Sequence, residues 1–165
     1  MTIGRFIAGV GGLIWHPASA TYLFLRRAGS RDFAAEAWEC VTGRVEHGEG
    51  FEAALHREVR EETATEVTIE FIVGVTHFYR GEPVNENELL GVIYSCTLLD
   101  RSSVELSAEH DTFAWLSVEE ARERFSGDPR NNWLLQTLAW TEEVRALASP
   151  KLLAQYRARG FSINV

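Results

Sequence analysis

The chain has 165 residues, of which 45% are hydrophobic and 24% charged, as is ordinary for one folded domain with a substantial core. Its net charge of −8 argues against a general nucleic-acid binder, for which a basic surface is typical. The two cysteines, Cys40 and Cys96, form no CxxC motif. We therefore expect neither a zinc site nor a disulfide framework, and we expect each cysteine to be a small buried residue in a strand.

The N-terminal segment, MTIGRFIAGVGGLIWHPASAT, allows two interpretations. An early Arg5, an apolar run and an ASA triplet outline a signal peptide. The alternative is a first strand over Arg5–Trp15 that ends in a turn at His16 and Pro17. Closely spaced glycines interrupt the apolar run, which favours the strand. No apolar run reaches the ~20 residues of a transmembrane helix, so we expect a cytoplasmic protein without a membrane partner.

Further strands are predicted from runs of β-branched and aromatic residues, at Tyr22–Arg26, Glu39–Thr42, Val67–Tyr79, Leu89–Leu99 and Thr112–Leu116. GSRD, RGEPVNENE and DRSS are typical of loops. Helices are predicted at Phe51–Thr63, Ser117–Phe125 and Asn131–Ala148, with a short one in the C-terminal segment, so that the C-terminal helices occupy about 117–158. Ser117 and Glu120 fit a capping box. Mixed strands and helices predict an α/β fold, a single domain over 1–165.

The helix predicted from Phe51 carries charge where apolar residues belong. At about 100° per residue, one apolar stripe contains Phe51, Ala54, Leu55 and Val59. Glu58 and Glu62 fall inside that stripe, one turn apart. Ionised carboxylates are costly to bury unless they are paired or bind a metal, so this helix must meet a compensating group.

The same helix belongs to a longer pattern. Fixed spacings connect Gly43, Glu49, Arg57, Glu58, Val59, Glu61 and Glu62. This pattern resembles the Nudix box, G-x5-E-x7-R-E-U-x-E-E-x-G-U with U aliphatic, over residues 43–65, and the chain is identified as a member of the MutT-like Nudix hydrolases. Two positions depart from the box: Ala64 replaces its glycine and Thr65 its aliphatic residue. The resemblance implies an α/β/α sandwich with a mixed sheet.

The box carboxylates predict a metal site. Glu58, Glu61 and Glu62 are three or four residues apart, so they share one edge of the helix, where like charges repel unless a cation lies among them. Oxygen ligands favour Mg²⁺ or Mn²⁺ over zinc. The resemblance adds Gly43 to the metal site. Arg57 is expected in the catalytic machinery, where it can pair with Glu49 or Glu61 and hold a ligand in place.

A carboxylate outside the box is expected to bind metal or to act as the general base. In Nudix relatives such a residue often lies in a loop, and Glu109, just before a predicted strand, is the candidate; the alternative is an ordinary loop carboxylate. Glu86 and Glu88 are rivals. His110 is expected to be structural.

Candidate substrate contacts come from strand ends and aromatic residues. Arg26 and Arg27 end a strand, where a guanidinium can bind phosphate; the alternative is a solvated strand end. Trp38, Phe78 and Tyr79 can stack on a flat ring, or they can pack in the core. We take Arg26, Arg27, Trp38 and Tyr79 as the predicted substrate-binding set.

The resemblance implies metal-dependent hydrolysis of a nucleoside diphosphate linked to a group X. The lead-in WECVTGRVEHGEG and the segment EHDTFAWLSVEEA are most similar to the branch that hydrolyses dihydroneopterin triphosphate and dATP, with release of pyrophosphate. Two alternatives stay open: a non-catalytic ligand-binding or regulatory Nudix-like domain, and an isomerase on the same scaffold. The partner is expected to be a small nucleotide or diphosphate, not a nucleic-acid duplex, and a homodimer is an open expectation.

Overall fold

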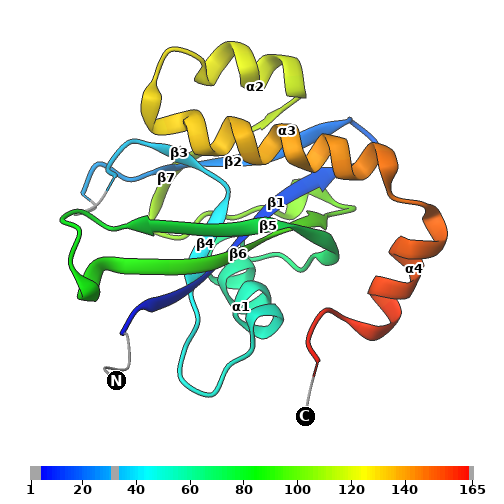
Figure 1. The fold of residues 1–165 in the computed structure, drawn as a ribbon. Coiled ribbons are helices and arrows are strands. Elements are labelled where there is room, and N and C mark those ends of the chain that lie inside the picture. Colours follow the sequence, from blue (N-terminus) through cyan, green and yellow to red (C-terminus); the bar gives the residue numbers. More distant parts are fainter. Residues whose placement is uncertain (1–4, 31–33, 164–165) are drawn as a thin grey trace.

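A mixed β-sheet forms the centre of the protein (Figure 1). The computed structural model describes residues 5–30 and 34–163, so parts of the loop predicted at GSRD and of the C-terminal tail lie outside the described residues. The described strands are β1 (Ile7–His16), β2 (Thr21–Arg27), β3 (Trp38–Glu39), β4 (Val41–Arg44), β5 (Thr68–Tyr79), β6 (Glu88–Thr97) and β7 (His110–Leu116). Their order is β3-β2-β1-β6-β5, with β4 paired to β1 and β7 to β2. β1 and β6 are parallel, and the other pairs are antiparallel.

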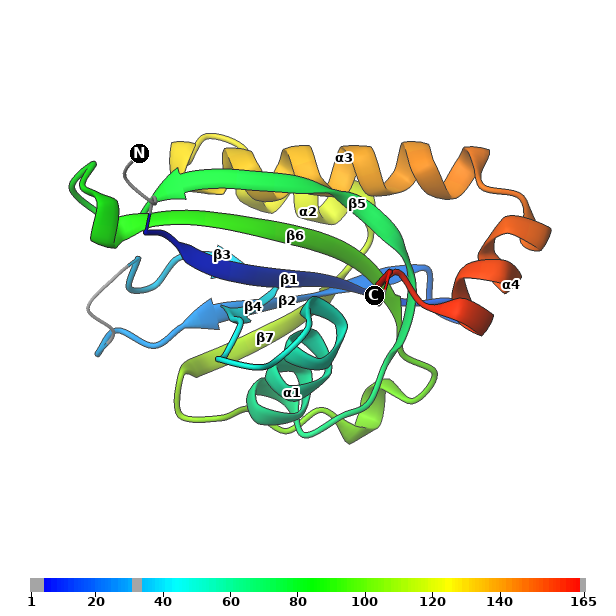
Figure 2. The ribbon, with the colours of Figure 1, turned by 60° about the horizontal axis from the view of Figure 1, so that its bottom comes forward.

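Helices cover both faces of this sheet (Figures 1 and 2). α1 (Phe51–Thr63) lies on one face, and α2 (Val118–Phe125) and α3 (Asn132–Leu147) lie on the other. α4 (Pro150–Arg159) packs beside β5. Short 3-10 helices occupy three connections, at Asn85–Asn87, Arg101–Ser103 and Pro129–Asn131. This arrangement confirms the predicted α/β/α sandwich with a mixed sheet.

Two hydrophobic cores hold the layers together, one on each face of the sheet. The first lies under α1 and includes Leu55 and Val59 of that helix. The second lies under α2 and α3 and includes Phe125 and Leu134. β2 contributes to both, because successive side chains of a strand point to opposite faces: Leu23 and Leu25 enter the first core, and Tyr22 and Phe24 the second.

The predicted strand Glu39–Thr42 is wrong in detail, because the chain changes partner within it. Trp38–Glu39 pairs with β2, whereas Val41–Arg44 pairs with β1. β1 and β2 themselves pair only from Ile14 to His16. Beyond Ile14 these two strands diverge, and the chain crosses between them at Cys40. Cys40 is fully buried, as is Cys96 of β6, which agrees with the expected burial of both thiols.

The buried face of α1 begins later than the apolar pattern predicted. Ala54, Leu55 and Val59 are fully buried, but Phe51 is 39% exposed and does not belong to the core under the helix. Phe51 is the first helical residue, and contact with the sheet starts only one turn further on. The capping box at α2 is present, with Ser117 and Glu120 each bonded to the other's backbone N–H.

α1 ends in a left-handed residue, although the box glycine is missing there. Ala64 has φ 54° and ψ 23°, and its N–H donates to the Arg60 carbonyl. Thr65, at the aliphatic box position, is buried, and its hydroxyl hydrogen-bonds to that of Thr63 at 2.8 Å. The helix end therefore keeps the geometry that glycine favours, with alanine in a strained conformation.

Substituting Ala64→Gly should stabilise the protein by about 1 kcal/mol, because glycine adopts this backbone conformation without the Cβ clash. The expected rise in Tm is about 2–4 °C for a protein of this size, measured by calorimetry. Ala53→Gly, at an exposed helical position of α1, is the matched control and should destabilise by roughly 0.5–1 kcal/mol. Equal destabilisation by both substitutions would contradict the strain at Ala64.

Within residues 5–30 and 34–163, none of the helices has the length and apolar character that a membrane crossing requires.

Candidate active site

The three box carboxylates lie along one edge of α1 at different depths. The Glu58 carboxylate reaches β4, where it accepts a hydrogen bond from the Arg44 backbone N–H at 3.2 Å. Glu62, one turn later, is only 4% exposed. The Glu61 side chain is 59% exposed. The helix thus carries negative charge from the open surface into the protein interior.

Arg57 holds the outer part of this carboxylate cluster together. Its guanidinium donates to both carboxylate oxygens of Glu49 at 3.0 Å, to Glu58 at 2.8 Å and to Glu61 at 3.2 Å. It also donates to the Arg44 carbonyl at 2.7 Å. Hydrogen bonding to Glu49, and then to Glu58, raises the pKa of Arg57. Both pairings that the sequence suggested for Arg57, with Glu49 and with Glu61, are thus present at the same time.

Gly43 lies within β4 rather than in a loop, and its lack of a side chain lets Glu58 approach the strand. A Cβ on Gly43 would lie 1.8 Å from the Glu58 carboxylate carbon and 2.0 Å from its Oε1. These distances are far shorter than any non-bonded contact. Only glycine therefore fits beside this carboxylate.

A buried ionic cluster centred on Glu39 lies beside the box residues. Glu39 Oε1 accepts a hydrogen bond from Arg27 at 2.9 Å and is joined to His110 Nε2 at 3.0 Å. Glu39 Oε2 accepts from the Thr42 hydroxyl at 3.2 Å. The side chains of Arg27, Glu39 and His110 are at most 11% exposed. His110 is thus buried against Glu39, and its structural role stays a prediction.

Glu39 was not among the site residues predicted from the sequence, although the sequence carries a signal for it. Glu39 stands in the run AWECV, between residues of apolar character. A charged residue in a strand with apolar neighbours needs a buried partner, for the same reason as Glu58 and Glu62 on the helix. Glu39 was therefore predictable from the sequence on the same grounds as Glu58 and Glu62.

Glu109 joins the site from the loop before β7. The residue is half-buried, and its backbone carbonyl accepts a hydrogen bond from the Ala28 N–H at 2.9 Å, which ties the loop to the end of β2. The charge of Glu109 acts on Glu62, as do those of Glu39 and Glu58. The structure therefore brings together carboxylates from β3, α1 and the loop before β7.

Glu62 has the least compensated charge of this group. Burial, above all, and then the neighbouring carboxylates raise its pKa well above the usual range. Burial also raises the pKa of Glu58, against the opposing effect of Arg57. Within the described part of the chain, Glu62 Oε2 is buried without a hydrogen-bond partner. A cation beside Glu62 would satisfy this oxygen and relieve the repulsion.

The residues present fit a hard divalent cation. Their donors are oxygens only, and the lack of a side chain at Gly43 lets the Glu58 carboxylate approach the strand closely. Among the described residues, no three acidic, His or Cys side chains already stand as a metal-holding group. Arg57 pairs with Oε1 of Glu58 and with Oε2 of Glu61, and a cation would bind these carboxylates beside the guanidinium.

A cleft of about 1040 Å³ opens over these residues. Of the predicted catalytic and metal residues, Gly43, Arg57, Glu58, Glu61 and Glu109 line it. Glu62 lies behind the wall, consistent with its burial. The rival acids Glu86 and Glu88 do not belong to the cleft wall; Glu88 pairs instead with His77 at 3.0 Å.

The predicted substrate-binding set is divided by the structure. Arg27 and Trp38 line the cleft, but Arg26 and Tyr79 do not. Arg26 points to the opposite face of β2 from Arg27, where it pairs with Asp111 at 2.8 Å.

The other two members of the predicted substrate-binding set are Trp38 and Tyr79. Trp38 packs against Phe125, with the Arg124 guanidinium 4.7 Å from its ring centroid. Trp38 thus packs against the core and also forms part of the cleft wall. Tyr79 is the last residue of β5, and it does not line the cleft. The residues on either side of it, Phe78 and Arg80, do. Adjacent residues of a strand point to opposite faces of the sheet, and the sequence did not show which of them faces the cleft.

Comparison with known proteins agrees with this site. The family model for the NUDIX domain matches residues 5–138. The chain belongs to the Nudix hydrolase family. This assignment confirms the resemblance to the Nudix family.

Curated relatives and solved structures extend the Nudix comparison. The nucleoside triphosphatase NudI of Escherichia coli is 28% identical over 106 residues, 60% of this chain and 74% of its own length. An octanoyltransferase of Myxococcus xanthus is 33% identical over 87 residues, 53% of this chain, which spans only 24% of that protein.

Among solved structures, the MutT protein of Methanosarcina mazei Go1 has a TM-score of 0.70 at 23% identity, covering 87% of this chain and 98% of the other. The E. coli dihydroneopterin triphosphate pyrophosphohydrolase has a TM-score of 0.63 at 21% identity, covering 87% and 99%. At these identities the likeness establishes the fold alone.

Proposed function

We propose that this protein is a Mg²⁺- or Mn²⁺-dependent hydrolase that cleaves a phosphoanhydride bond in a nucleoside diphosphate linked to X. One observation carries the proposal: Glu62 is buried without a partner for Oε2, beside further carboxylates and next to a large open cleft. Such charge is costly without a cation. A structural ion-pair network would have satisfied that oxygen within the protein.

We assign the ligand set to Glu58, Glu61, Glu62 and the backbone at Gly43. When bound there, the divalent ions would neutralise diphosphate oxygens and lower the pKa of a water. Arg57 keeps Glu58 and Glu61 on one edge of α1 through its several hydrogen bonds. Its role is to orient these carboxylates.

We assign the general base to Glu109, which lines the cleft from the loop before β7. Its carboxylate would take a proton from water as the water oxygen bonds to phosphorus. The bridging P–O bond breaks, and its electron pair stays on the departing phosphate oxygen. A nucleoside triphosphate would thus yield a monophosphate and pyrophosphate. Arg27 and Trp38 are the proposed substrate contacts, since both line the cleft.

The substrate class we propose is a (deoxy)nucleoside triphosphate or a pterin triphosphate. The name of the relative NudI, a nucleoside triphosphatase, supports the first, and the solved pyrophosphohydrolase of dihydroneopterin triphosphate has the same fold. The box lead-in of this chain is similar to that branch. A cytoplasmic location and homodimer formation stay predictions.

The deciding experiment measures phosphate and pyrophosphate release from a panel of purine, pyrimidine and pterin triphosphates, nucleoside diphosphate sugars and dinucleoside polyphosphates. We expect turnover that depends on Mg²⁺ or Mn²⁺ and that chelation abolishes. Metal-dependent binding of nucleotides without any release would instead identify a ligand-binding domain.

Substituting Glu62→Gln should weaken binding of Mg²⁺ or Mn²⁺ at least about tenfold, because the shape is kept and the charge is lost. Titration calorimetry measures this affinity. In metal-free buffer the variant should be at least as stable as the wild type, because the substitution removes an uncompensated buried charge. Glu66→Gln is the control, as Glu66 is an exposed carboxylate that pairs with Arg60 outside the cleft. Equal metal affinities in all three proteins would refute the site.

A further inference from the structure

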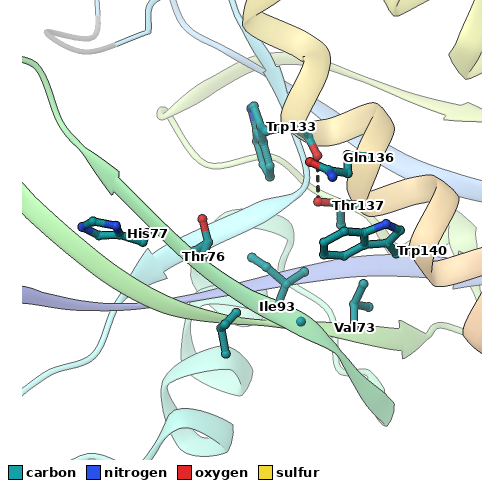
Figure 3. A pocket seen from close by; sticks show the side chains of 10 residues that line it. Val73, Thr76, His77, Ile93, Trp133, Gln136, Thr137 and Trp140 are labelled. Atoms are coloured by element: carbon teal, nitrogen blue, oxygen red, sulfur yellow. Dashed lines mark hydrogen bonds between the residues drawn. The ribbon is translucent and has the colours of Figure 1, made fainter.

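A smaller pocket opens from the cleft between β5 and α3, and we call it the α3 pocket (Figure 3). Its volume is about 170 Å³. The walls come from β5 over residues 73–77 and from α3, with Ile93 of β6 between them. Thr76, Ile93 and Trp133 line both the α3 pocket and the cleft, so the two spaces are adjacent.

The walls of the α3 pocket suit a flat ring. Trp133 and Trp140 are 40% and 46% exposed, although large apolar side chains usually lie in the core. Both project from α3 toward β5 in Figure 3. Exposed indole faces stack on heteroaromatic rings without regard to sequence or substituent. Neither tryptophan is a member of the core under α3, so packing alone does not explain them.

The polar residues of the pocket wall are Thr76, His77, Gln136 and Thr137. Gln136 is exposed between the two tryptophans and carries both donor and acceptor atoms. The Thr137 hydroxyl donates to the Trp133 carbonyl at 2.8 Å and so fixes the helix surface. Opposite, Gly74 leaves space beneath Trp140, whose ring would lie 3.5 Å from a Cβ at that position. Tryptophan walls, together with polar side chains that offer donors and acceptors, are typical of a subsite for a heteroaromatic ring.

The strand register places the α3 pocket far from the box. Gly74 of β5 pairs with Ile93, Ile93 with Gly11, and Gly11 with Thr42, the neighbour of Gly43. Three strand spacings of about 4.8 Å make a separation of roughly 14 Å. A substrate whose diphosphate lies at the box would therefore present its most distant part, the ring, to the α3 pocket.

We propose that the α3 pocket receives the outer ring of a bicyclic heteroaromatic substrate, a purine or a pterin, and so selects it over a single-ring pyrimidine. This inference rests on the proposed function, whose site it completes. An enclosed cavity of about 150 Å³ holds one benzene ring. The α3 pocket thus has room for one ring, while the ring nearer the phosphates lies in the cleft beside Trp133. The Gln136 amide bonds to the outer ring edge.

Two variants test this assignment without altering the carboxylates. Gly74→Val fills the α3 pocket from β5, and Gln136→Leu removes the amide from the helix surface. The control is Ile72→Thr, an exposed β5 residue outside the pocket wall. For the wild type we expect kcat/KM for purine or pterin triphosphates to exceed that for pyrimidine triphosphates by roughly 5- to 150-fold, the range of one stacked ring. Gly74→Val should remove most of this preference through KM, with pyrimidine turnover unchanged.

A binding measurement without turnover separates this inference from the proposed function. Tryptophan fluorescence is titrated with GMP and with CMP in metal-free buffer. GMP should bind more tightly to wild type and control, and the difference should shrink in both pocket variants. Hydrolysis with equal use of purines and pyrimidines would overturn the α3 pocket but not the hydrolase. Selective GMP binding without hydrolysis of any phosphoanhydride would overturn the hydrolase and leave the pocket. If Gly74→Val does not fold, Gln136→Leu still decides.

Discussion

Glu109→Gln is expected to lower kcat by roughly 10²–10⁴ with little change in KM, the range for a lost general base. Glutamine keeps the shape of the side chain but cannot accept the proton of the attacking water. The box carboxylates are committed to cations in the proposed site, so a base from another element is needed. Glu109 is the acid that the loop before β7 brings to the cleft. Steady-state kinetics with saturating Mg²⁺ measure the effect.

Two comparisons make this result decisive. Glu86→Gln and Glu88→Gln should have much smaller effects, because neither residue lines the cleft. If Glu109→Gln keeps near-normal turnover while Glu58→Gln abolishes it, the base lies on α1 and Glu109 is an ordinary loop residue. Calorimetric metal titration of Glu109→Gln adds a second readout. A large loss of metal affinity would assign Glu109 to the ligands instead.

Gly43→Ala should lower kcat/KM by about 10² or more. The new Cβ would lie 1.8 Å from the Glu58 carboxylate carbon, so the carboxylate must move by more than about 1 Å to restore contact distance. That displacement also breaks its hydrogen bond from the Arg44 N–H and disturbs the pairing with Arg57. Kinetics and metal titration should both show the loss.

Gly50→Ala is the matched control for Gly43→Ala. Gly50 precedes α1, has an ordinary extended backbone, and has no atom within 4 Å of a Cβ built on it. This control should keep nearly wild-type activity, with a loss of stability of about 1 kcal/mol or less, because alanine is a poorer N-cap than glycine. Full activity and metal affinity in Gly43→Ala would show that Glu58 has no fixed role in the site.

The box residues were predictable because their signal is local. Glu58 and Glu62 break the apolar stripe of a single helix, and the helical period alone shows the conflict. The carboxylates of other elements that raise the pKa of Glu62 could not be identified as its neighbours from a local signal. Glu39 lies on β3 and Glu109 precedes β7, so only the pairing of both strands with β2 brings them together.

Side-chain direction separated the substrate candidates that line the cleft from those that do not. Arg26 and Arg27 are adjacent and chemically identical, yet one pairs with Asp111 on the outer face and the other with Glu39 inside. Phe78 lines the cleft and Tyr79 does not. Strand alternation was evident from the sequence, but the face that each residue occupies depends on register with neighbouring strands.

The sequence by itself determined the family and the helix that carries the carboxylates, because both follow from spacing within short segments. The α/β/α layers followed from the family resemblance. The tertiary structure decided three further points: the change of partner at Cys40, the buried cluster around Glu39, and the meeting of β5 with α3 at the α3 pocket. Each depends on contacts between residues far apart in the chain. No local period encodes such contacts, because they are set by how whole elements pack.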